Sequence, residues 1–303
     1  MFDWVGAMQC SKCRREAVVL QRYSGLHLCR DHFIADLEAK AKREIRQKRM
    51  IVSGDVIAVA LSGGKDSSAL LRFLTRTFGE RRDVSILALT VDEGIAGYRH
   101  PEQAHQIAEA CGVPWHCVTF QEIAGTTTDR IVEMRGDALS CTYCGVIRRH
   151  CLNTAARDLG ATKLAMGMNL DDEAQSVLMN VLRGDAERLI RRPAPLPGVV
   201  RRIKPFAGVP EREVALYAHL TIGRFEEASC PYAHNALRSD VRAILNEYAW
   251  RHPATKYALK NLGDQVPEIC NAGEADLQVC PECGEPFSGV CRSCQLIREA
   301  RGG

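Results

Sequence analysis

The sequence has no long apolar run and no large excess of charge of either sign. No stretch approaches the roughly 18 uninterrupted apolar residues expected of a transmembrane helix. Residues 1–8 lack a basic region followed by a long apolar run, so we predict no secretory signal and expect a cytoplasmic protein without a membrane partner. The formal net charge is only +3 among 303 residues, and this balance alone does not indicate a nucleic-acid-binding protein.

Cysteine, in contrast, is abundant and grouped. The chain contains 14 cysteines, many of them in pairs with two residues between the partners. Because cytosolic thiols stay reduced, such pairs favour metal binding or redox chemistry over disulfides.

The chain divides into three blocks. Residues 1–35 hold a Cys/His cluster, residues 36–270 alternate strand-like with helix-like patterns, and residues 271–303 hold four more paired cysteines. In the middle block we predict strands at 55–61, 84–91, 115–120 and 163–168, and helices at 67–78, 102–111, 146–159, 211–220 and 234–250. This alternation predicts an α/β fold, a doubly wound parallel sheet whose ligands bind at the carboxyl ends of the strands.

The first predicted strand runs directly into Ser-Gly-Gly-Lys-Asp-Ser and then a helix. The glycines let the backbone approach an anion, and the helix N-terminus presents N–H groups to it. This is not a Walker A loop, because Lys65 is followed by Asp66. The candidate nucleotide-binding residues here are Ala60, Ser62, Gly63, Gly64, Lys65, Asp66 and Ser67.

This segment resembles the PP-loop of the adenine nucleotide alpha-hydrolase superfamily, which has the form S-G-G-x-D-S. The resemblance implies that ATP is cleaved to AMP and pyrophosphate while an oxygen is adenylated. It places Asp66 near the pyrophosphate and its Mg²⁺, since a carboxylate among phosphates needs a cation.

A second motif, Cys141-Thr142-Tyr143-Cys144, precedes a helix rich in arginine, and Cys230 lies far along the chain. A Cys-x-x-Cys pair at a helix start beside arginines is expected to have lowered thiol pKa values. The pair could be a redox or persulfide-forming dithiol, or the three cysteines could hold an iron–sulfur cluster with one open iron. A structural zinc site is a third possibility, and the spacing does not separate the three.

The terminal blocks each carry four soft ligands at paired spacing. The first set is Cys10, Cys13, Cys29 and His32, and the second is Cys280, Cys283, Cys291 and Cys294. A closed set of four such ligands is typical of structural zinc, so we predict two Zn²⁺ ions, in an N-terminal finger and a C-terminal ribbon.

Together, these motifs and the segment 169–174 resemble the TtuA/NcsA/TtcA group of tRNA 2-thiolation enzymes, in its branch with two zinc modules. The resemblance implies a [4Fe–4S] cluster on Cys141, Cys144 and Cys230, whose unique iron carries the sulfide that attacks. It also implies that Gly167 and Asp172 lie at the ATP and uridine site. Where that group has histidine this chain has Met168, so a role for the histidine does not transfer. Arg148 stands where the group often has lysine, and could steady the nucleotide.

The resemblance further implies a tRNA substrate, a homodimer, and a sulfur donor that is free sulfide or a ubiquitin-like thiocarboxylate carrier protein. The resemblance implies that the target is the wobble or the T-loop uridine, and residues 178–185 favour the enzymes that modify the wobble uridine. The competing interpretations are a different PP-loop enzyme, of the amidotransferase or lysidine-ligase type, and a zinc-stabilised nucleic-acid-binding protein with a vestigial nucleotide site.

Basic residues concentrate in two regions that could bind RNA phosphates or simply be solvated. They are Lys40, Lys42, Arg43, Arg46, Lys48 and Arg49 in the first, and Arg183, Arg188, Arg191, Arg192, Arg201, Arg202 and Lys204 in the second.

Overall fold

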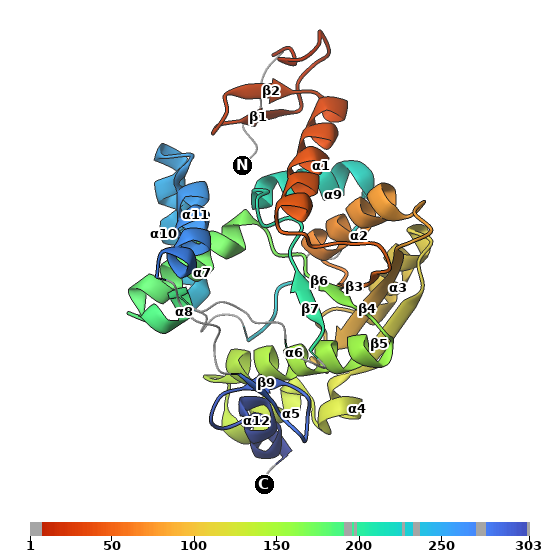
Figure 1. The fold of residues 1–303 in the computed structure, drawn as a ribbon, viewed down its shortest axis with the longest axis vertical. Coiled ribbons are helices and arrows are strands. Elements are labelled where there is room, and N and C mark those ends of the chain that lie inside the picture. Colours follow the sequence, from red (N-terminus) through yellow and green to blue (C-terminus); the bar gives the residue numbers. More distant parts are fainter. Residues whose placement is uncertain are drawn as a thin grey trace.

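The computed structural model describes residues 8–190, 196, 199–225, 228–232, 237–270 and 277–301. At its centre lies a five-stranded sheet with all neighbouring strands parallel, in the order β5–β4–β3–β6–β7 (Figure 1). The strands are β3 (Val56–Ala60), β4 (Ser85–Asp92), β5 (Trp115–Thr119), β6 (Lys163–Ala165) and β7 (Arg201–Ile203).

The sheet is covered on both faces, because its central strand is apolar on both. Ile57 and Val59 pack into one buried cluster, whereas Ala58 between them packs into another. The first cluster is covered by α1 (Arg30–Gln47), α2 (Lys65–Phe78), α3 (Pro101–Ala110) and α9 (Glu211–Thr221). The second face is covered by α6 (Ser140–Asp158), next to α4 (Phe120–Ala124) and α5 (Thr128–Arg135). The predicted doubly wound α/β fold is therefore confirmed.

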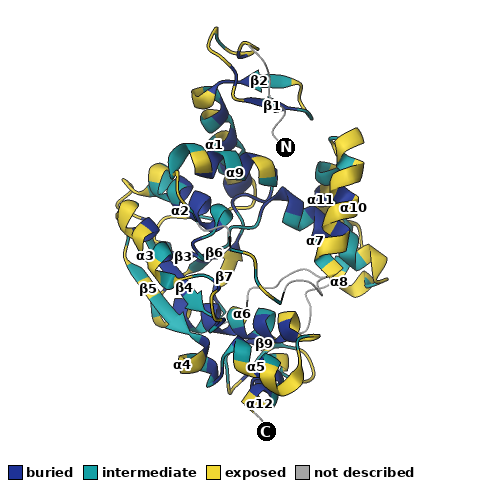
Figure 2. Cartoon of the chain, turned by 180° about the vertical axis from the view of Figure 1, so that it is seen from behind, coloured by how far each residue is buried: buried dark blue, intermediate teal, exposed yellow. Residues whose placement is uncertain are grey.

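A helical part stands beside the sheet (Figure 1). It consists of α7 (Leu170–Leu182), α8 (Ala186–Ile190), α10 (Leu237–Arg251) and α11 (Thr255–Ile269), with α10 and α11 packed on α7. Much of α10 is exposed (Figure 2). No helix in the described ranges is both long enough and apolar enough to cross a membrane.

The two cysteine-rich modules lie at opposite ends of the molecule (Figure 1). The N-terminal module contains the hairpin β1 (Val19–Gln21) and β2 (Leu26–Leu28) and leads into α1. The C-terminal module contains β8 (Gln278–Val279), β9 (Pro286–Phe287) and α12 (Arg292–Arg301), and α12 packs against α6. The boundaries 1–35, 36–270 and 271–303 stay predictions.

Several elements differ from the sequence-based expectation, and the helices α4, α5, α8 and α11 were not predicted. β6 ends at Ala165, because the chain turns towards the phosphate loop there, and not at residue 168. The edge strand β7 was not predicted, since three residues are too few for a periodic pattern. The helix expected at 146–159 begins six residues earlier, so the Cys-x-x-Cys pair lies inside the first turn of α6 and not before it. Residues 233–236, where the helix 234–250 was expected to start, lie outside the described ranges, and α10 is described from Leu237.

Candidate active site

The candidate site lies where the strand order reverses. From β3 the chain moves outward to β4 and β5, and it then returns to place β6 and β7 on the other side of β3. The loops after β3 and β6 therefore diverge and leave a crevice at the carboxyl edge of the sheet, which is where α/β sheets bind ligands. Both predicted nucleotide-binding segments, 60–67 and 167–172, span these loops and the first residues of the helices that follow, α2 and α7.

The loop after β3 is held in a tight turn that leads into α2. Gly63 has φ of 78°, a left-handed conformation that disfavours other residues. The Ser67 hydroxyl accepts a hydrogen bond from the backbone N–H of Ser62 at 3.1 Å and donates one to the carbonyl of Gly64 at 3.1 Å. The turn thus presents the N-terminus of α2 to the crevice, as anion binding requires.

Gly167 brings the second loop against this turn. A Cβ atom at Gly167 would lie 2.9 Å from the backbone nitrogen of Ser67 and 3.0 Å from the carbonyl carbon of Asp66. Only a residue without a side chain allows the two loops to approach this closely.

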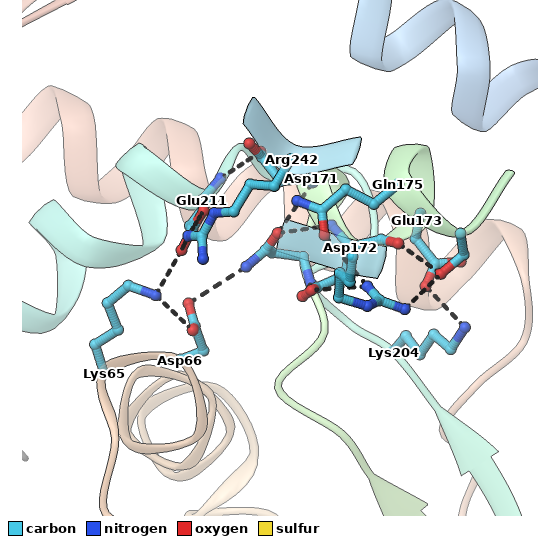
Figure 3. Close-up of polar contacts among 12 residues, drawn as sticks. Lys65, Asp66, Asp171, Asp172, Glu173, Gln175, Lys204, Glu211 and Arg242 are labelled. Atoms are coloured by element: carbon cyan, nitrogen blue, oxygen red, sulfur yellow. Dashed lines mark hydrogen bonds and ion pairs between the residues drawn. The ribbon is translucent and has the colours of Figure 1, made fainter. Parts of the chain in front are cut away.

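Carboxylates from the two loops meet beside this contact (Figure 3). Asn169 caps α7 through a reciprocal capping box with Asp172, and its amide donates to Asp66 at 3.4 Å. Burial raises the pKa of both Asp66 and Asp172, and the cations Lys65 and Arg238 oppose this effect only in part. Two partly desolvated carboxylates next to a phosphate loop are suited to a divalent cation.

The side chain of Lys65 lies on the other side of Asp66. Its ammonium group donates to Asp66 at 2.7 Å and to Glu211 at 2.9 Å, and Glu211 also pairs with Arg242 (Figure 3). The charge that we expected Lys65 to offer to phosphate is therefore shared with two carboxylates, and its role at the nucleotide stays a prediction.

A cavity of about 200 Å³ opens at the carboxyl edge of β3. Among its lining residues are predicted site residues from three segments, namely Ala60, Ser62, Asp66, Ser67, Arg148 and Gly167. It is also lined by Glu93, Arg99 and Met168, of which the first two were not singled out from the sequence. Glu93 follows β4 just as Ser62 follows β3, so the strand-end rule could have found it.

The cysteine pair adjoins this cavity through Arg148. The guanidinium donates to Cys144 Sγ at 3.1 Å and forms an ion pair with Glu93 at 2.7 Å. Burial raises the pKa of the Cys144 thiol, although Arg148 acts in the opposite direction. The expectation of a lowered pKa is thus wrong for the Cys144 thiol. Its side chain is buried in a cluster with residues of α12 and is not presented to water.

The third cysteine is brought to the same end of α6 by the chain around it. The exposed Cys141 contacts the carbonyl of Tyr232 at 3.7 Å, two residues beyond Cys230. The Tyr98 phenol lies within electrostatic reach of both Arg148 and Cys230. All three cysteines are free thiols, and Arg148, which contacts Cys144, links them to the cavity that it lines.

The described residues contain two groups of four metal-binding side chains, each with its ligand atoms within 4.8 Å of one another. They are the two sets predicted from the spacing: Cys10, Cys13, Cys29 and His32, and Cys280, Cys283, Cys291 and Cys294. In the first, Cys10 Sγ and His32 Nδ1 are 3.3 Å apart, and in the second, Cys283 and Cys291 are 3.5 Å apart. A tetrahedral zinc ion with bonds near 2.3 Å places its sulfur ligands about 3.8 Å apart, so both groups suit such an ion.

Family models match along most of the chain. Residues 9–34 match the N-terminal LIM domain of the 2-thiouridine synthetase TtuA, and residues 37–248 match the PP-loop domain. The tRNA 2-thiolation protein NcsA of Haloferax volcanii is 36% identical over 96% of this chain and 98% of its own length. This chain belongs to the PP-loop family of tRNA 2-thiolation proteins.

Relatives of this family extend to eukaryotes and to a solved structure. Cytoplasmic tRNA 2-thiolation protein 1 of Drosophila grimshawi is 34% identical over 95% of this chain and 86% of its own length. The U34-tRNA thiolase NcsA from Methanococcus maripaludis, solved with its [4Fe-4S] cluster, is 31% identical and superimposes with a TM-score of 0.84 over 96% of both chains. The likeness therefore covers both terminal modules as well as the sheet.

Proposed function

We propose that this protein is an ATP-dependent tRNA uridine 2-sulfurtransferase of the cytoplasm. In the proposed reaction, the C2 oxygen of a uridine attacks the α-phosphorus of ATP and pyrophosphate leaves. A sulfide then attacks C2, and the oxygen departs with AMP. The observation that carries this proposal is that Arg148, which donates to Cys144, lines the same cavity as the phosphate loop.

Residues at one end of the cavity would bind the nucleotide, and residues at the other end would bind the sulfur. The turn at 62–67 and the N-terminus of α2 would hold the phosphates, and Asp66 and Asp172 would hold Mg²⁺. Gly167 would keep the two loops close enough for both to contact the nucleotide. Arg148 keeps its charge at neutral pH, so it would orient the nucleotide or a sulfur atom and would not transfer a proton.

The three cysteines suit an iron–sulfur cluster better than a single metal ion. Cys141, Cys144 and Cys230 do not form one of the compact groups of the described residues. A cluster holds each thiolate on a different iron, which separates the sulfurs further than one zinc ion does. Cys141, Cys144 and Cys230 would hold such a cluster, and its chemistry would supply a sulfide near the cavity.

We further propose structural zinc in both terminal modules and uridine 34 as the target. Support for zinc comes from the ligand distances above. Support for uridine 34 comes from the full-length likeness to a U34-tRNA thiolase and from the run 178–185. A homodimer, and free sulfide or a thiocarboxylated carrier protein as the donor, stay predictions.

The decisive experiment measures cluster content and thiolation together. Anaerobically purified protein should be brown, should contain about four irons per chain, and should form 2-thiouridine in tRNA with release of AMP. Cys141→Ala, Cys144→Ala and Cys230→Ala should each abolish thiolation and the cluster's absorbance while the circular dichroism stays unchanged. Cys117→Ala serves as the control, because Cys117 lies on the outer strand β5. Full thiolation by iron-free wild-type protein would replace the cluster with a catalytic dithiol.

A further inference from the structure

A second and larger cavity, of about 490 Å³, lies on the far side of Lys65 from the nucleotide cavity. It is bounded by the β1–β2 hairpin of the N-terminal module, the start of α9, and the facing ends of α10 and α11. Its volume is in the range of about 300 to 1,000 Å³ that is typical of ligand pockets. Of the residues to which the proposed reaction assigns a role at the phosphates, Mg²⁺ or sulfur, Lys65 is shared with this cavity, and its other lining residues have no such role.

Aromatic side chains form much of its wall. Arg22 lies over the indole of Trp250, with its guanidinium carbon 3.8 Å from the ring centroid. The rings of Tyr23 and Tyr257 lie 5.1 Å apart at an angle of 58°. Trp250 is 55% exposed although Arg22 lies over one face of its indole, so much of this large apolar surface is still available to a partner.

The charges of the wall leave a positive rim. Its three acids are each bound by a lysine: Asp171 by Lys256, Glu211 by Lys65, and Glu213 by Lys40 at 2.9 Å. None of these pairs uses the two arginines of the wall, Arg22 and Arg212. A flat aromatic surface beneath arginine is the combination that proteins use to hold an unstacked nucleotide base.

The cavity is also connected to the active site. Lys65 lines it and donates to Asp66, which lines the nucleotide cavity. Asp171 lines it and is followed by Asp172, the proposed Mg²⁺ ligand. A uridine that reaches the Asp66–Asp172 region therefore places its neighbouring nucleotides within reach of the second cavity.

We propose that this cavity binds an unpaired base of the tRNA loop, next to the uridine that is modified. The base stacks on Trp250, Arg22 covers it or binds its phosphate, and Arg212 neutralises the adjoining backbone. The proposal rests on the proposed function, because it takes the same RNA as substrate. It assigns the N-terminal module a direct part in RNA recognition, through the residue Arg22 of its hairpin.

The test combines variants of the protein with single abasic positions in the RNA. The RNA is an anticodon stem-loop that contains uridine 34, and its affinity is measured by fluorescence anisotropy at fixed salt. Trp250→Ala should weaken binding about tenfold, since base–aromatic stacking is worth roughly 1–3 kcal/mol. Trp250→Phe should retain most of the affinity, and Arg22→Ala should lower it.

Two controls match these variants in chemistry. Tyr248→Ala removes an aromatic ring from the same exposed helix, where it stacks on His252 and does not line the cavity. Arg81→Ala removes an arginine just beyond the far end of α2, where it pairs with Asp83. Both should bind the RNA like the wild type.

The double-mutant cycle decides the proposal. An abasic site at the nucleotide that stacks on Trp250 should weaken wild-type binding and leave Trp250→Ala unaffected. Full additivity at every loop position overturns the inference, even when the wild type forms 2-thiouridine and the proposed function stands. In another outcome, Trp250→Ala binds the RNA as tightly as the wild type but no longer binds a peptide ending in Gly-Gly, which the wild type does bind. The cavity then binds a carrier protein, and the inference is wrong. If wild-type protein forms no 2-thiouridine but the cycle shows coupling, the proposed function fails and the base site remains.

Discussion

Because Gly167 approaches the phosphate loop so closely, adding a single methyl group there tests whether this contact shapes the site. Gly167→Ala would place Cβ 2.9 Å from the backbone nitrogen of Ser67, and that turn is held by hydrogen bonds on both sides. The loops must then move apart, so we expect affinity for Mg·ATP to fall at least tenfold while the helical content is unchanged. Isothermal titration calorimetry with a non-hydrolysable ATP analogue measures this loss.

Gly145→Ala is the matched control for that substitution. Gly145 lies inside α6, and a Cβ there meets no atom within 4 Å. Alanine in a helix interior is favoured over glycine by about 0.5–1 kcal/mol, so this variant should melt slightly later and bind ATP normally. Equal ATP affinities of the two variants would show that the contact at Gly167 does not shape the site.

The raised pKa values of Asp66 and Asp172 predict a pH dependence of metal binding. Burial favours the protonated form of both groups, so they take up protons at a higher pH than an ordinary aspartate. Because Mg²⁺ needs the ionised carboxylates, affinity for Mg·ATP should fall as the pH is lowered, and the fall should begin at a higher pH than ordinary aspartates would give. Calorimetry between pH 4.5 and 7.5 tests this dependence, and Asp172→Asn should shift its midpoint; an unchanged pH profile would exclude Asp172 as a ligand.

At the scale of single residues, sequence reasoning found the groups that belong to motifs and missed those that depend on packing. Gly63 and Ser67 could be assigned because a contiguous motif fixes their geometry. Glu93 and Arg99 lie in the cavity because β4 ends beside β3; the end of a predicted strand could have indicated Glu93, whereas no local pattern marks Arg99. The pKa of Cys144 was predicted in the wrong direction, since burial depends on the neighbours of α6 and not on the adjacent arginines.

At the scale of elements, α12 ties the C-terminal module to the sulfur site. Cys291 and Cys294 stand at the start of α12, so a metal held by the module fixes the first turn of this helix. Further along, Leu296 and Ile297 pack in one cluster with Tyr143 and Cys144. Tyr143 stands between the two cysteines in the sequence, and its hydroxyl donates a hydrogen bond to the carboxylate of Glu299 in α12 at 2.7 Å.

This arrangement predicts that damage to the C-terminal metal group reaches the cysteine pair of α6. Cys291→Ser should loosen α12, and iron content after anaerobic reconstitution should fall to less than half of the wild-type value. Cys10→Ser is the control, because its module packs on α1 and α9 at the other end of the molecule. Full iron content in Cys291→Ser protein, with its C-terminal metal lost, would show that α12 does not position the pair.

The elements also show where pattern reading ends. The four long strand patterns were identified because each is an apolar run bounded by turn residues. The predicted start of α6 is six residues late, because Cys141 to Cys144 carries no apolar periodicity, and the helix there packs on α5 and on α12, which comes from a distant part of the chain.

At the scale of the whole molecule, basic residues that are neighbours in sequence have different surroundings. In α1, Lys40 pairs with Asp36 and Glu213, and Lys48 pairs with Glu44 and Asp264. Much of the first basic region therefore stabilises the packing of helices and offers less charge to RNA than the sequence suggested. In the second region, Arg191 and Arg192 lie outside the described residues, and Lys204 pairs with Glu173 at 2.7 Å.

Arginines from three elements, α6, β7 and α8, gather instead around Arg149, which follows Arg148 in α6. Desolvation and the nearby Arg202 lower the pKa of Arg149, and Arg148 and Arg188 act in the same direction, so these like charges are held close together. Such repulsion is relieved when a polyanion binds.

Arg149→Gln and Arg202→Gln should each make the plot of log affinity for tRNA against log salt concentration less steep. The magnitude of its negative slope should fall by about 0.7 to 0.9, the value for one phosphate contact. Arg81→Gln, which removes an arginine paired with Asp83, should leave the slope unchanged. Because the attraction between arginine and phosphate does not depend on the RNA sequence, both variants should weaken binding of matched and mismatched loops equally. A loss of affinity confined to one loop sequence would assign these arginines to base contacts and not to the backbone.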